Sequence, residues 1–325
     1  MDNRTAGVAI YCGSATPALA AAVAGHLGLT LGGRELTRFP DGEVRVQLEQ
    51  SVRGRDIYII QSTCAPVNEH LMELLILIDA FHRASAGRIT AIIPYYGYAR
   101  QEKKTTGREP ITAKLVANLI AEAGAHRVVA VDLHSAAIQG FFDIGMDHLT
   151  AVPLIAEYLR ATFDLTNTVV VAPDTGGAKL ADSYAFMLNL PLVVMHKRRA
   201  SPHDVEVRAV VGSVIGKRPI IVDDIIATGG TIRACAHALV EAGALPEVIV
   251  AATHPVFSPP VADYLNDPLI SSVIVTDTIP IPAALRLPKV QELSVAPLLA
   301  EAITRLHTDR SISEYLRAHR ERRPV

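Results

Sequence analysis

The sequence predicts an α/β protein built from two similar domains, each a mainly parallel sheet flanked by helices. Two observations lead to this fold class. Short runs rich in Val and Ile alternate with amphipathic segments along the chain, and the order of segments in the first half returns in the second half. Strands that alternate with helices form parallel sheets whose faces the helices cover.

The expected strands are the β-branched apolar runs that end in polar or glycine-rich segments. Strands buried on both faces read as continuous apolar runs of this kind, without alternation of apolar and polar residues. We expect them at residues 8–11, 57–61, 89–95, 128–131, 169–172, 192–195, 220–222, 248–251 and 273–275.

The expected helices lie between these runs. The clearest extends from about Asn68 to Ala84, because apolar residues recur on one helical face. These residues are Leu71, Leu74, Leu75, Ile78 and Phe81. A second helix is predicted from Pro110 to Gly124, since proline suits the first helical turn and glycine follows helix ends. A third is predicted over residues 232–240.

An internal repeat suggests where the domains divide. Residues 54–60, 89–95 and 128–134 have the same pattern as residues 216–224, 248–254 and 273–278. Unrelated α/β units also share such a pattern, but 325 residues suffice for two domains. We therefore place the first domain at 1–150, the second at 151–305 and a C-terminal tail at 306–325.

Composition argues against several classes of protein. Half of the residues are apolar (50%), but no apolar run approaches the roughly 20 residues of a membrane-spanning helix. A net charge of −2 and the absence of Trp leave neither a basic surface nor a stacking platform for nucleic acid. The start, Met1–Arg4, lacks a signal-peptide pattern, and the three cysteines show no CxxC spacing. We expect a cytoplasmic protein that binds neither nucleic acid nor membranes.

The most informative stretch is Pro219–Thr231, in which an apolar strand reaches Asp223 and Asp224 and then a glycine-rich turn before a helix. The unpaired amides and the dipole of a helix N-terminus favour an anion there. Glycine lets a phosphate approach the backbone, and Thr228 adds a hydroxyl donor. Two carboxylates beside a phosphate suit the vicinal hydroxyls of a sugar. The stretch predicts a ribose 5-phosphate site; its alternative is a polar turn.

Other polar segments add candidates, most of them after predicted strands, where ligands bind in open α/β sheets. Residues 39–43 form a tight turn with an aromatic ring and two acids. Arg100 and Gln101 come shortly after a predicted strand and three tyrosines near its end, and they could bind the phosphates and base of a nucleotide. The sequence contains neither GxxxxGK[ST] nor a GxGxxG after a strand, so any ATP would bind without a P-loop.

Further candidates could bind a metal or phosphate. Asp132 and His134 end one strand, and Asp174 opens a second loop of an acid followed by glycines. Mg²⁺ suits oxygen ligands of this kind, because it binds through one or two carboxylates plus substrate phosphates. Lys197 and Arg199 lie in a basic segment after another strand. A histidine or a basic loop in such a place more often has a structural or solvated role.

Seven motifs in this order resemble those of the ribose-phosphate pyrophosphokinases, also known as phosphoribosyl pyrophosphate synthetases. They are residues 39–43, 94–104, 132–134, 138–143, 173–177, 197–199 and 223–231. The resemblance extends from about Val8 to Glu301. This family converts ATP and ribose 5-phosphate into AMP and phosphoribosyl pyrophosphate with Mg²⁺. The resemblance implies two phosphoribosyltransferase-like domains, the first on the ATP side and the second on the ribose 5-phosphate side.

The resemblance also implies a role for each motif. The ATP-binding residues would be Phe39, Asp41, Gly42, Glu43, Arg100 and Gln101. The ligands of Mg²⁺ and its phosphates would be His134, Asp174 and Asp132. The ribose 5-phosphate site would consist of Asp223, Asp224, Ala227, Thr228, Gly229, Gly230 and Thr231. Lys197 and Arg199 would be the catalytic cations that close over the reacting β-phosphate.

The chain departs from the family pattern at a few positions. Ala227 stands where many members have Asp, Glu102 stands where Asp is usual, and Leu316 replaces a usual Phe. These changes bear on the affinity for ribose 5-phosphate and on control by phosphate and ADP. The resemblance implies a homo-oligomer, usually a hexamer. Two rival functions remain at this stage: a non-catalytic, synthetase-associated regulatory subunit, and a phosphoribosyltransferase.

Overall fold

The computed structural model describes residues 7–199 and 205–320, with the side chains of all of them except 197–199, 205–209 and 319–320. The chain forms two compact units. The first contains the chain up to Thr150, together with Thr278–Pro280 and Ser294–Arg317. The second contains Ala151–Asp277, Ile281–Leu293 and the end of the chain from Ala318.

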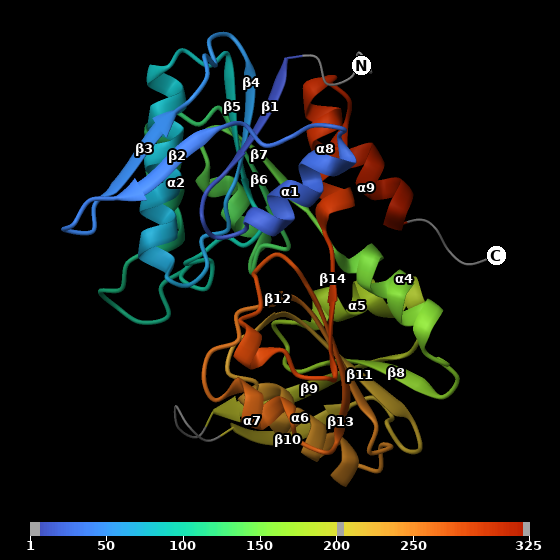
Figure 1. Cartoon of the computed structure of the whole chain (residues 1–325). Coiled ribbons are helices and arrows are strands. Elements are labelled where there is room, and N and C mark those ends of the chain that lie inside the picture. Colours follow the sequence, from blue (N-terminus) through green and yellow to red (C-terminus); the bar gives the residue numbers. More distant parts are fainter. Residues whose placement is uncertain (1–6, 200–204, 321–325) are drawn as a thin grey trace. The chain divides into compact units, whose positions relative to one another are not determined.

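The first unit is built on a five-stranded sheet in the order β1-β4-β5-β6-β7 (Figure 1). Every neighbouring pair in this sheet is parallel. The strands are β1 (Val8–Cys12), β4 (Asp56–Ile60), β5 (Arg88–Ile93), β6 (Arg127–Val131) and β7 (Gly145–Leu149). A separate antiparallel hairpin consists of β2 (Arg34–Arg38) and β3 (Val44–Leu48).

Helices α2 (Val67–Arg83) and α3 (Thr112–Glu122) cover one face of this sheet. Leu74, Leu77 and Ile78 of α2 are fully buried against alternate residues of the strands. The short helix η2 (Ala136–Phe141) follows β6 and also contributes to this core. The sheet and its apolar helix faces thus follow from the sequence pattern.

Residues 294–317, near the C-terminus, belong to the first unit. Helix α8 (Ala296–His307) packs on α1 (Pro17–His26), and its Leu299 and Ile303 are fully buried. Helix α9 (Ile312–Arg320) follows it. The predicted second domain, 151–305, therefore differs from the second unit, because the apolar face of α8 is buried in the first unit.

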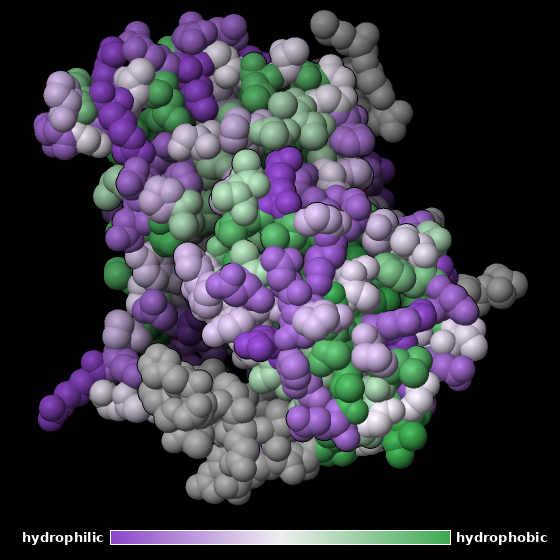
Figure 2. All heavy atoms as spheres, turned by 60° about the horizontal axis from the view of Figure 1, so that its bottom comes forward, coloured by the Kyte–Doolittle hydropathy of each residue, from purple (hydrophilic) through white to green (hydrophobic). Residues whose placement is uncertain are grey.

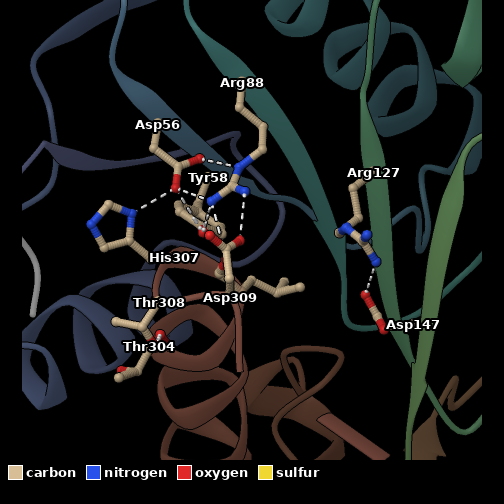
Figure 3. Close-up of polar contacts among 10 residues, drawn as sticks. Asp56, Tyr58, Arg88, Arg127, Asp147, Thr304, His307, Thr308 and Asp309 are labelled. Carbon is tan, nitrogen blue, oxygen red and sulfur yellow. Dashed lines mark hydrogen bonds and ion pairs between the residues drawn. The ribbon is translucent and has the colours of Figure 1, made fainter. Parts of the chain in front are cut away.

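Polar contacts join the C-terminal end of α8 to the N-terminal ends of β4 and β5 (Figure 3). The Asp56 carboxylate accepts a hydrogen bond from Nε of Arg88 at 2.9 Å and contacts Nδ1 of His307 at 2.8 Å. The Tyr58 hydroxyl donates to the same carboxylate at 3.0 Å. Asp309, just beyond α8, lies 3.8 Å from Arg88. These contacts fix the helix end to the sheet.

The second unit is built on a seven-stranded sheet in the order β10-β9-β8-β11-β12-β13-β14 (Figure 1). All neighbouring pairs are parallel except β9 and β10. The strands are β8 (Thr168–Ala172), β9 (Leu192–Arg199), β10 (Val205–Val211), β11 (Arg218–Ile226), β12 (Val248–Pro255), β13 (Ile270–Thr276) and β14 (Val290–Leu293).

Helices lie on both faces of the second sheet. Helices α6 (Gly230–Glu241) and α7 (Val261–Leu265) share a core with alternate strand residues. Helix α5 (Ala178–Leu188) packs on β8, β9 and β11 outside that core, so it covers the opposite face, and α4 (Val152–Thr162) packs on α5. The short helix η3 (Ala283–Leu285) precedes β14.

The predicted α/β class and mainly parallel sheets are confirmed, and all the predicted strands are present. The strands that the sequence did not predict are β2, β3, β7, β10 and β14. They lack a continuous apolar run because polar or charged residues interrupt each of them. The helix expected from Pro110 begins at Thr112.

The surface carries some large apolar side chains. On the face drawn in Figure 2, hydrophobic and hydrophilic residues are interspersed. Met72, Leu115 and Leu119 of the first unit are exposed by 53%, 55% and 41%. None of the helices in the described ranges combines the length and the apolar character needed to span a bilayer.

Candidate active site

The loop at residues 227–231 joins the carboxyl end of β11 to α6. The strand extends through Ile226, which pairs with Pro255 of β12. Asp223 and Asp224 therefore lie within the strand, and the prediction that it ends at Val222 is wrong. Pairing of β11 with β12 continues beyond the apolar run at residues 220–222, and no pattern in the sequence predicts that the strand extends this far.

Gly229 occupies the N-cap position of α6 with a φ of +82°. This left-handed conformation favours glycine. A glycine cap has no side chain to offer the amides of the first helical turn, which remain available to a ligand. The dipole of the twelve-residue helix adds a positive partial charge at the same point. The 227–231 loop can therefore bind an anion such as phosphate.

Three carboxylates gather near this loop in the second unit. Asp223 is half-buried, and its Oδ1 accepts a hydrogen bond from the Asp224 amide at 2.9 Å. Burial, and then the negative charges of Asp224 and Asp174, raise the pKa of Asp223 well above its usual value. Like charges at close range disfavour ionisation. A cation or hydroxyl donors of a ligand would relieve this repulsion.

Asp174 lies in the loop between β8 and α5. Its Oδ1 accepts a hydrogen bond from the Gly177 amide at 3.1 Å, so the carboxylate is bound to the backbone of its own loop. A Cβ atom on Gly176 would lie 3.2 Å from the same oxygen, which is closer than Cβ contacts usually are. Since β8 and β11 are parallel neighbours, Asp174 and Asp223 lie at the same edge of the sheet.

Lys197 and Arg199 lie in the last residues of β9, where the sequence predicted a loop. The strand is longer than its apolar run because it pairs with β10 through Arg199. The side chains of both cations lie outside the described residues. Because β9 runs parallel to β8, its carboxyl end belongs to the same edge as Asp174.

In the first unit, Arg100 and Gln101 are exposed in the loop that precedes α3. The Gln101 carbonyl accepts from the Ala113 amide at 3.3 Å, and its Oε1 accepts from the Thr112 hydroxyl at 2.6 Å. The start of α3 thus anchors this loop. Within the described part of the chain, Arg100 has no ion-pair partner.

Phe39, Asp41, Gly42 and Glu43 form the tip of the β2–β3 hairpin. The Phe39 amide donates to the Glu43 carbonyl at 2.9 Å, and the Glu43 amide donates to Asp41 Oδ1 at 3.2 Å. Gly42 has a φ of +96°. The Phe39 ring is 48% exposed, so it can contact a ligand.

Asp132 and His134 lie in the segment that follows β6 in the first unit. Asp132 is buried, with a φ of +37°, and its amide donates to the Leu149 carbonyl at 2.9 Å. His134 is exposed. His148 of β7, which sequence reasoning missed, accepts from the Leu133 amide through Nε2 at 2.8 Å. Only pairing with β7 brings His148 to this segment.

The predicted metal ligands are divided between the units, with Asp132 and His134 in the first and Asp174 in the second. Among the described residues, no group of three or more His, Cys, Asp or Glu side chains is arranged to hold a metal ion. The carboxylates nonetheless suit Mg²⁺, which usually keeps several waters and uses few protein ligands. Besides burial, the negative charges of Asp224 and Asp174 raise the pKa of Asp223, and a cation nearby would offset these charges.

Comparisons with known proteins show which family the two units resemble. A family model described as the N-terminal domain of ribose phosphate pyrophosphokinase matches residues 8–124. A second model, described as a phosphoribosyl synthetase-associated domain, matches residues 206–317. Both units are therefore represented in the matches.

Individual relatives cover nearly the whole chain. The ribose-phosphate pyrophosphokinase of a Nostoc species is 52% identical over 309 residues, covering 95% of this chain and 93% of its own. That of Bacillus subtilis is 50% identical over 304 residues, covering 94% and 95%. The crystal structure of phosphoribosylpyrophosphate synthetase from Mycobacterium smegmatis has a TM-score of 0.88 at 45% identity, covering 93% of this chain and 99% of its own.

Proposed function

Because the chain belongs to the ribose-phosphate pyrophosphokinase family, we propose that it transfers the pyrophosphoryl group of ATP to the C1 hydroxyl of ribose 5-phosphate. The products are phosphoribosyl pyrophosphate and AMP. The observation that supports this most strongly is that Asp223 and Asp224 lie near the carboxyl end of β11, and the helix that follows, α6, begins with backbone amides that no side chain caps. The hydroxyls of ribose 5-phosphate can bind the two carboxylates, and its phosphate can bind the helix amides.

The second unit binds ribose 5-phosphate in this proposal. Asp223 and Asp224 accept hydrogen bonds from the ribose hydroxyls, and the 227–231 loop holds the 5-phosphate. The raised pKa of Asp223 supports this role, since a hydroxyl donor stabilises a crowded carboxylate. Ala227 contributes only backbone to the loop, and its carbonyl accepts from the Ser258 amide at 3.1 Å.

The first unit binds ATP. Arg100 and Gln101 contact its phosphates and base, Phe39 stacks beside the adenine, and Asp41, Gly42 and Glu43 complete the contacts. The exposure of Phe39 and Arg100 at a hairpin tip and a loop supports this assignment. An exposed guanidinium without an ion-pair partner among the described residues suits a phosphate ligand.

The reaction needs positioning and charge neutralisation more than covalent chemistry. The C1 hydroxyl attacks the β-phosphorus in line, and AMP leaves. Lys197 and Arg199 neutralise the charge that develops on the β-phosphoryl oxygens. The parallel arrangement of β8, β9 and β11 supports this role, because it brings the ends of all three strands to one sheet edge.

Mg²⁺ is the proposed cofactor, and its charge would neutralise the phosphates of ATP. Asp174 would hold it in the second unit, and Asp132 and His134 in the first. The donor set supports Mg²⁺, since it consists mainly of carboxylate oxygens, which this hard cation prefers.

We also propose a cytoplasmic homo-oligomer, with a hexamer as the expected size. Large exposed apolar residues on α2 and α3, such as Met72 and Leu115, support self-association, because exposed apolar patches often mark interfaces. Mass measurement by light scattering on the purified protein tests the size: a hexameric mass is expected, and a monomer would refute this part of the proposal.

Release of AMP tests the activity. Purified protein is incubated with ATP and Mg²⁺, with and without ribose 5-phosphate, and AMP is measured. We expect AMP only when ribose 5-phosphate is present, and far less with Lys197→Ala. A regulatory subunit would form no AMP, and a phosphoribosyltransferase would consume phosphoribosyl pyrophosphate and release pyrophosphate. Failure to form AMP at saturating substrates would refute the proposed activity.

A further inference from the structure

Helix α7 packs against the backbone of the 227–231 loop. A Cβ atom on Gly229 would lie 3.3 Å from Cβ of Tyr264 and 3.6 Å from Val261. A Cβ atom on Gly230 would lie 3.5 Å from Cε2 of Tyr264. Tyr264 therefore packs directly on the glycine backbone whose amides face the proposed phosphate.

Arg233 connects Tyr264 to the first turn of α6. Its amide donates to the Gly229 carbonyl at 3.0 Å, so it lies one turn along the helix from the loop. Its guanidinium carbon lies 5.5 Å from the centroid of the Tyr264 ring, within the range of a cation–π contact. The tyrosine ring thus contacts the glycines and the arginine of the same helical turn.

The buried side chain of Asp267 binds Arg233 and a second residue of α6, His237. One carboxylate oxygen contacts Nε of Arg233 at 2.9 Å and Nε2 of His237 at 2.8 Å. The other accepts the Leu269 amide at 3.0 Å. The Asp267 side chain is 4% exposed, whereas those of Arg233 and His237 are each 48% exposed.

The backbone of Asp267 is also fixed. The Lys289 ammonium donates to the carbonyls of Asp267 at 3.2 Å and Ile270 at 2.7 Å. Although burial opposes ionisation, hydrogen bonds from His237, the Leu269 amide and Arg233 lower the pKa of Asp267 to about 2. The carboxylate is therefore ionised at neutral pH and anchors two successive turns of α6.

We propose that Asp267 is a positioning residue for ribose 5-phosphate: by holding Arg233, and through it Tyr264, it fixes the Gly229–Gly230 backbone in the conformation that binds the 5-phosphate. This role rests on the proposed function of the 227–231 loop. Asp267 does not itself touch the substrate. Its effect should therefore appear mainly in affinity for one substrate, because a preorganised site binds its ligand more tightly.

The first test is Asp267→Asn, which keeps the side-chain size and removes its charge. We expect the Kd for ribose 5-phosphate, measured by calorimetry, to rise on the order of tenfold. The KM for ribose 5-phosphate should rise in parallel, while kcat and the KM for ATP change less than about twofold. Equal losses for both substrates, or an unchanged Kd, would overturn the positioning role.

A matched control is Glu247→Gln in the same unit. It breaks the ion pair between Glu247 and Arg218, which are 2.9 Å apart, without touching α6 or α7. We expect an unchanged Kd for ribose 5-phosphate. A loss equal to that of Asp267→Asn would show that any lost ion pair in this unit has the same effect, and would overturn the proposal.

Arg233→Ala provides a second route, because this exposed side chain can be removed even if Asp267→Asn fails to fold. It should also weaken ribose 5-phosphate binding, and Arg233→Lys should restore part of the loss. In the double variant with Asp267→Asn the two losses should be less than additive, since both act through one contact. Normal binding by Arg233→Ala would contradict the proposal.

The two proposals fail in different ways. If the unmodified protein binds no ribose 5-phosphate and forms no AMP, the proposed function is refuted, and the role of Asp267 with it. If the unmodified protein binds and turns over ribose 5-phosphate while Asp267→Asn and Arg233→Ala bind it normally, only the positioning role is refuted.

Discussion

Asp223 is the residue whose environment most constrains the proposed chemistry. Burial and two neighbouring carboxylates, Asp224 and Asp174, raise its pKa well above the usual value. Its ionised form, which would accept hydrogen bonds from the ribose, is therefore lost at a higher pH than for an exposed aspartate. The acidic limb of the pH profile should report this residue.

We predict that Asp224→Asn shifts this limb. Removing the adjacent negative charge lowers the pKa of Asp223, so its carboxylate persists to lower pH. Although overall activity falls, the acidic limb of kcat/KM for ribose 5-phosphate should move to lower pH than in the unmodified protein. The measurement is a pH profile at constant ionic strength. A limb that stays in place or moves to higher pH would contradict the assignment.

Lys197 is expected to act on the transition state. By analogy with cations that stabilise phosphoryl transfer, Lys197→Ala should lower kcat by a factor on the order of 10³–10⁵. The KM for ribose 5-phosphate should change far less, because the 227–231 loop remains intact. Steady-state kinetics with both substrates varied distinguishes the two effects, and near-normal turnover would refute the role.

Among the elements, α8 completes the first unit by packing on α1. Its end is held by the contacts of Asp56 with Arg88 and His307 (Figure 3). Although burial opposes the charge, hydrogen bonds from Arg88 and His307 lower the pKa of Asp56. A carboxylate with a lowered pKa stabilises the fold above its unfolded pKa, and that stabilisation is lost as the pH falls.

We predict that Asp56→Asn destabilises the protein by about 1–3 kcal/mol at pH 7, since buried donors lose a charged acceptor. The difference in the free energy of unfolding should shrink below about pH 4, where the aspartate becomes protonated in the unfolded chain, and should be lost as the pH falls through the lowered pKa of the folded state. Denaturant titrations at several pH values provide the measurement. Equal differences at pH 7 and in acid would contradict the linkage.

Asp79→Asn is the matched control. Asp79 pairs with Arg83 across one turn of α2, and their side chains are 47% and 77% exposed. Exposed pairs contribute little, so the expected change is below about 1 kcal/mol. A loss as large as that of Asp56→Asn would show that burial does not determine the effect.

The sequence predicted those elements whose apolar pattern is continuous. Strands β5 and β12 were found because Val and Ile runs are typical of buried parallel strands. The β2–β3 hairpin was missed because its partly exposed residues, such as Arg34 and Glu35, lack such a run. The ends of β9 and β11 were missed because pairing with neighbouring strands continues into polar residues.

The site was predictable to a similar extent. The sequence singled out Asp174 and the 227–231 loop as candidates because acids and glycines after strands form a local pattern. Tyr264 and Asp267 were not singled out, because their contacts with Arg233 of α6 arise from packing between segments that no local pattern encodes. Long-range packing thus accounts for what the sequence alone did not reveal.

For the molecule as a whole, the two units are not two consecutive stretches of chain. Residues 294–317 return to the first unit after the second has been completed. Ser62 of the first unit likewise donates a hydrogen bond to the carbonyl of Thr278 at 2.6 Å. The first unit therefore needs the C-terminal segment to be complete.

We predict that truncation after Leu293 lowers the thermal midpoint by several degrees, because it exposes the face of α1 that packs on α8. Truncation after Arg320, which leaves α8 and α9 in place, is the control and should leave the midpoint unchanged. Differential scanning calorimetry provides the measurement. Equal midpoints for the two truncations would contradict the division into units.

The most direct test of the proposed activity is the fate of the ATP phosphates, followed by ³¹P nuclear magnetic resonance with Mg²⁺ and ribose 5-phosphate. We predict that AMP and phosphoribosyl pyrophosphate appear in equal amounts, with the β- and γ-phosphorus atoms of ATP found together on the ribose. Formation of ADP with a singly phosphorylated sugar product, or no reaction at all, would contradict pyrophosphoryl transfer.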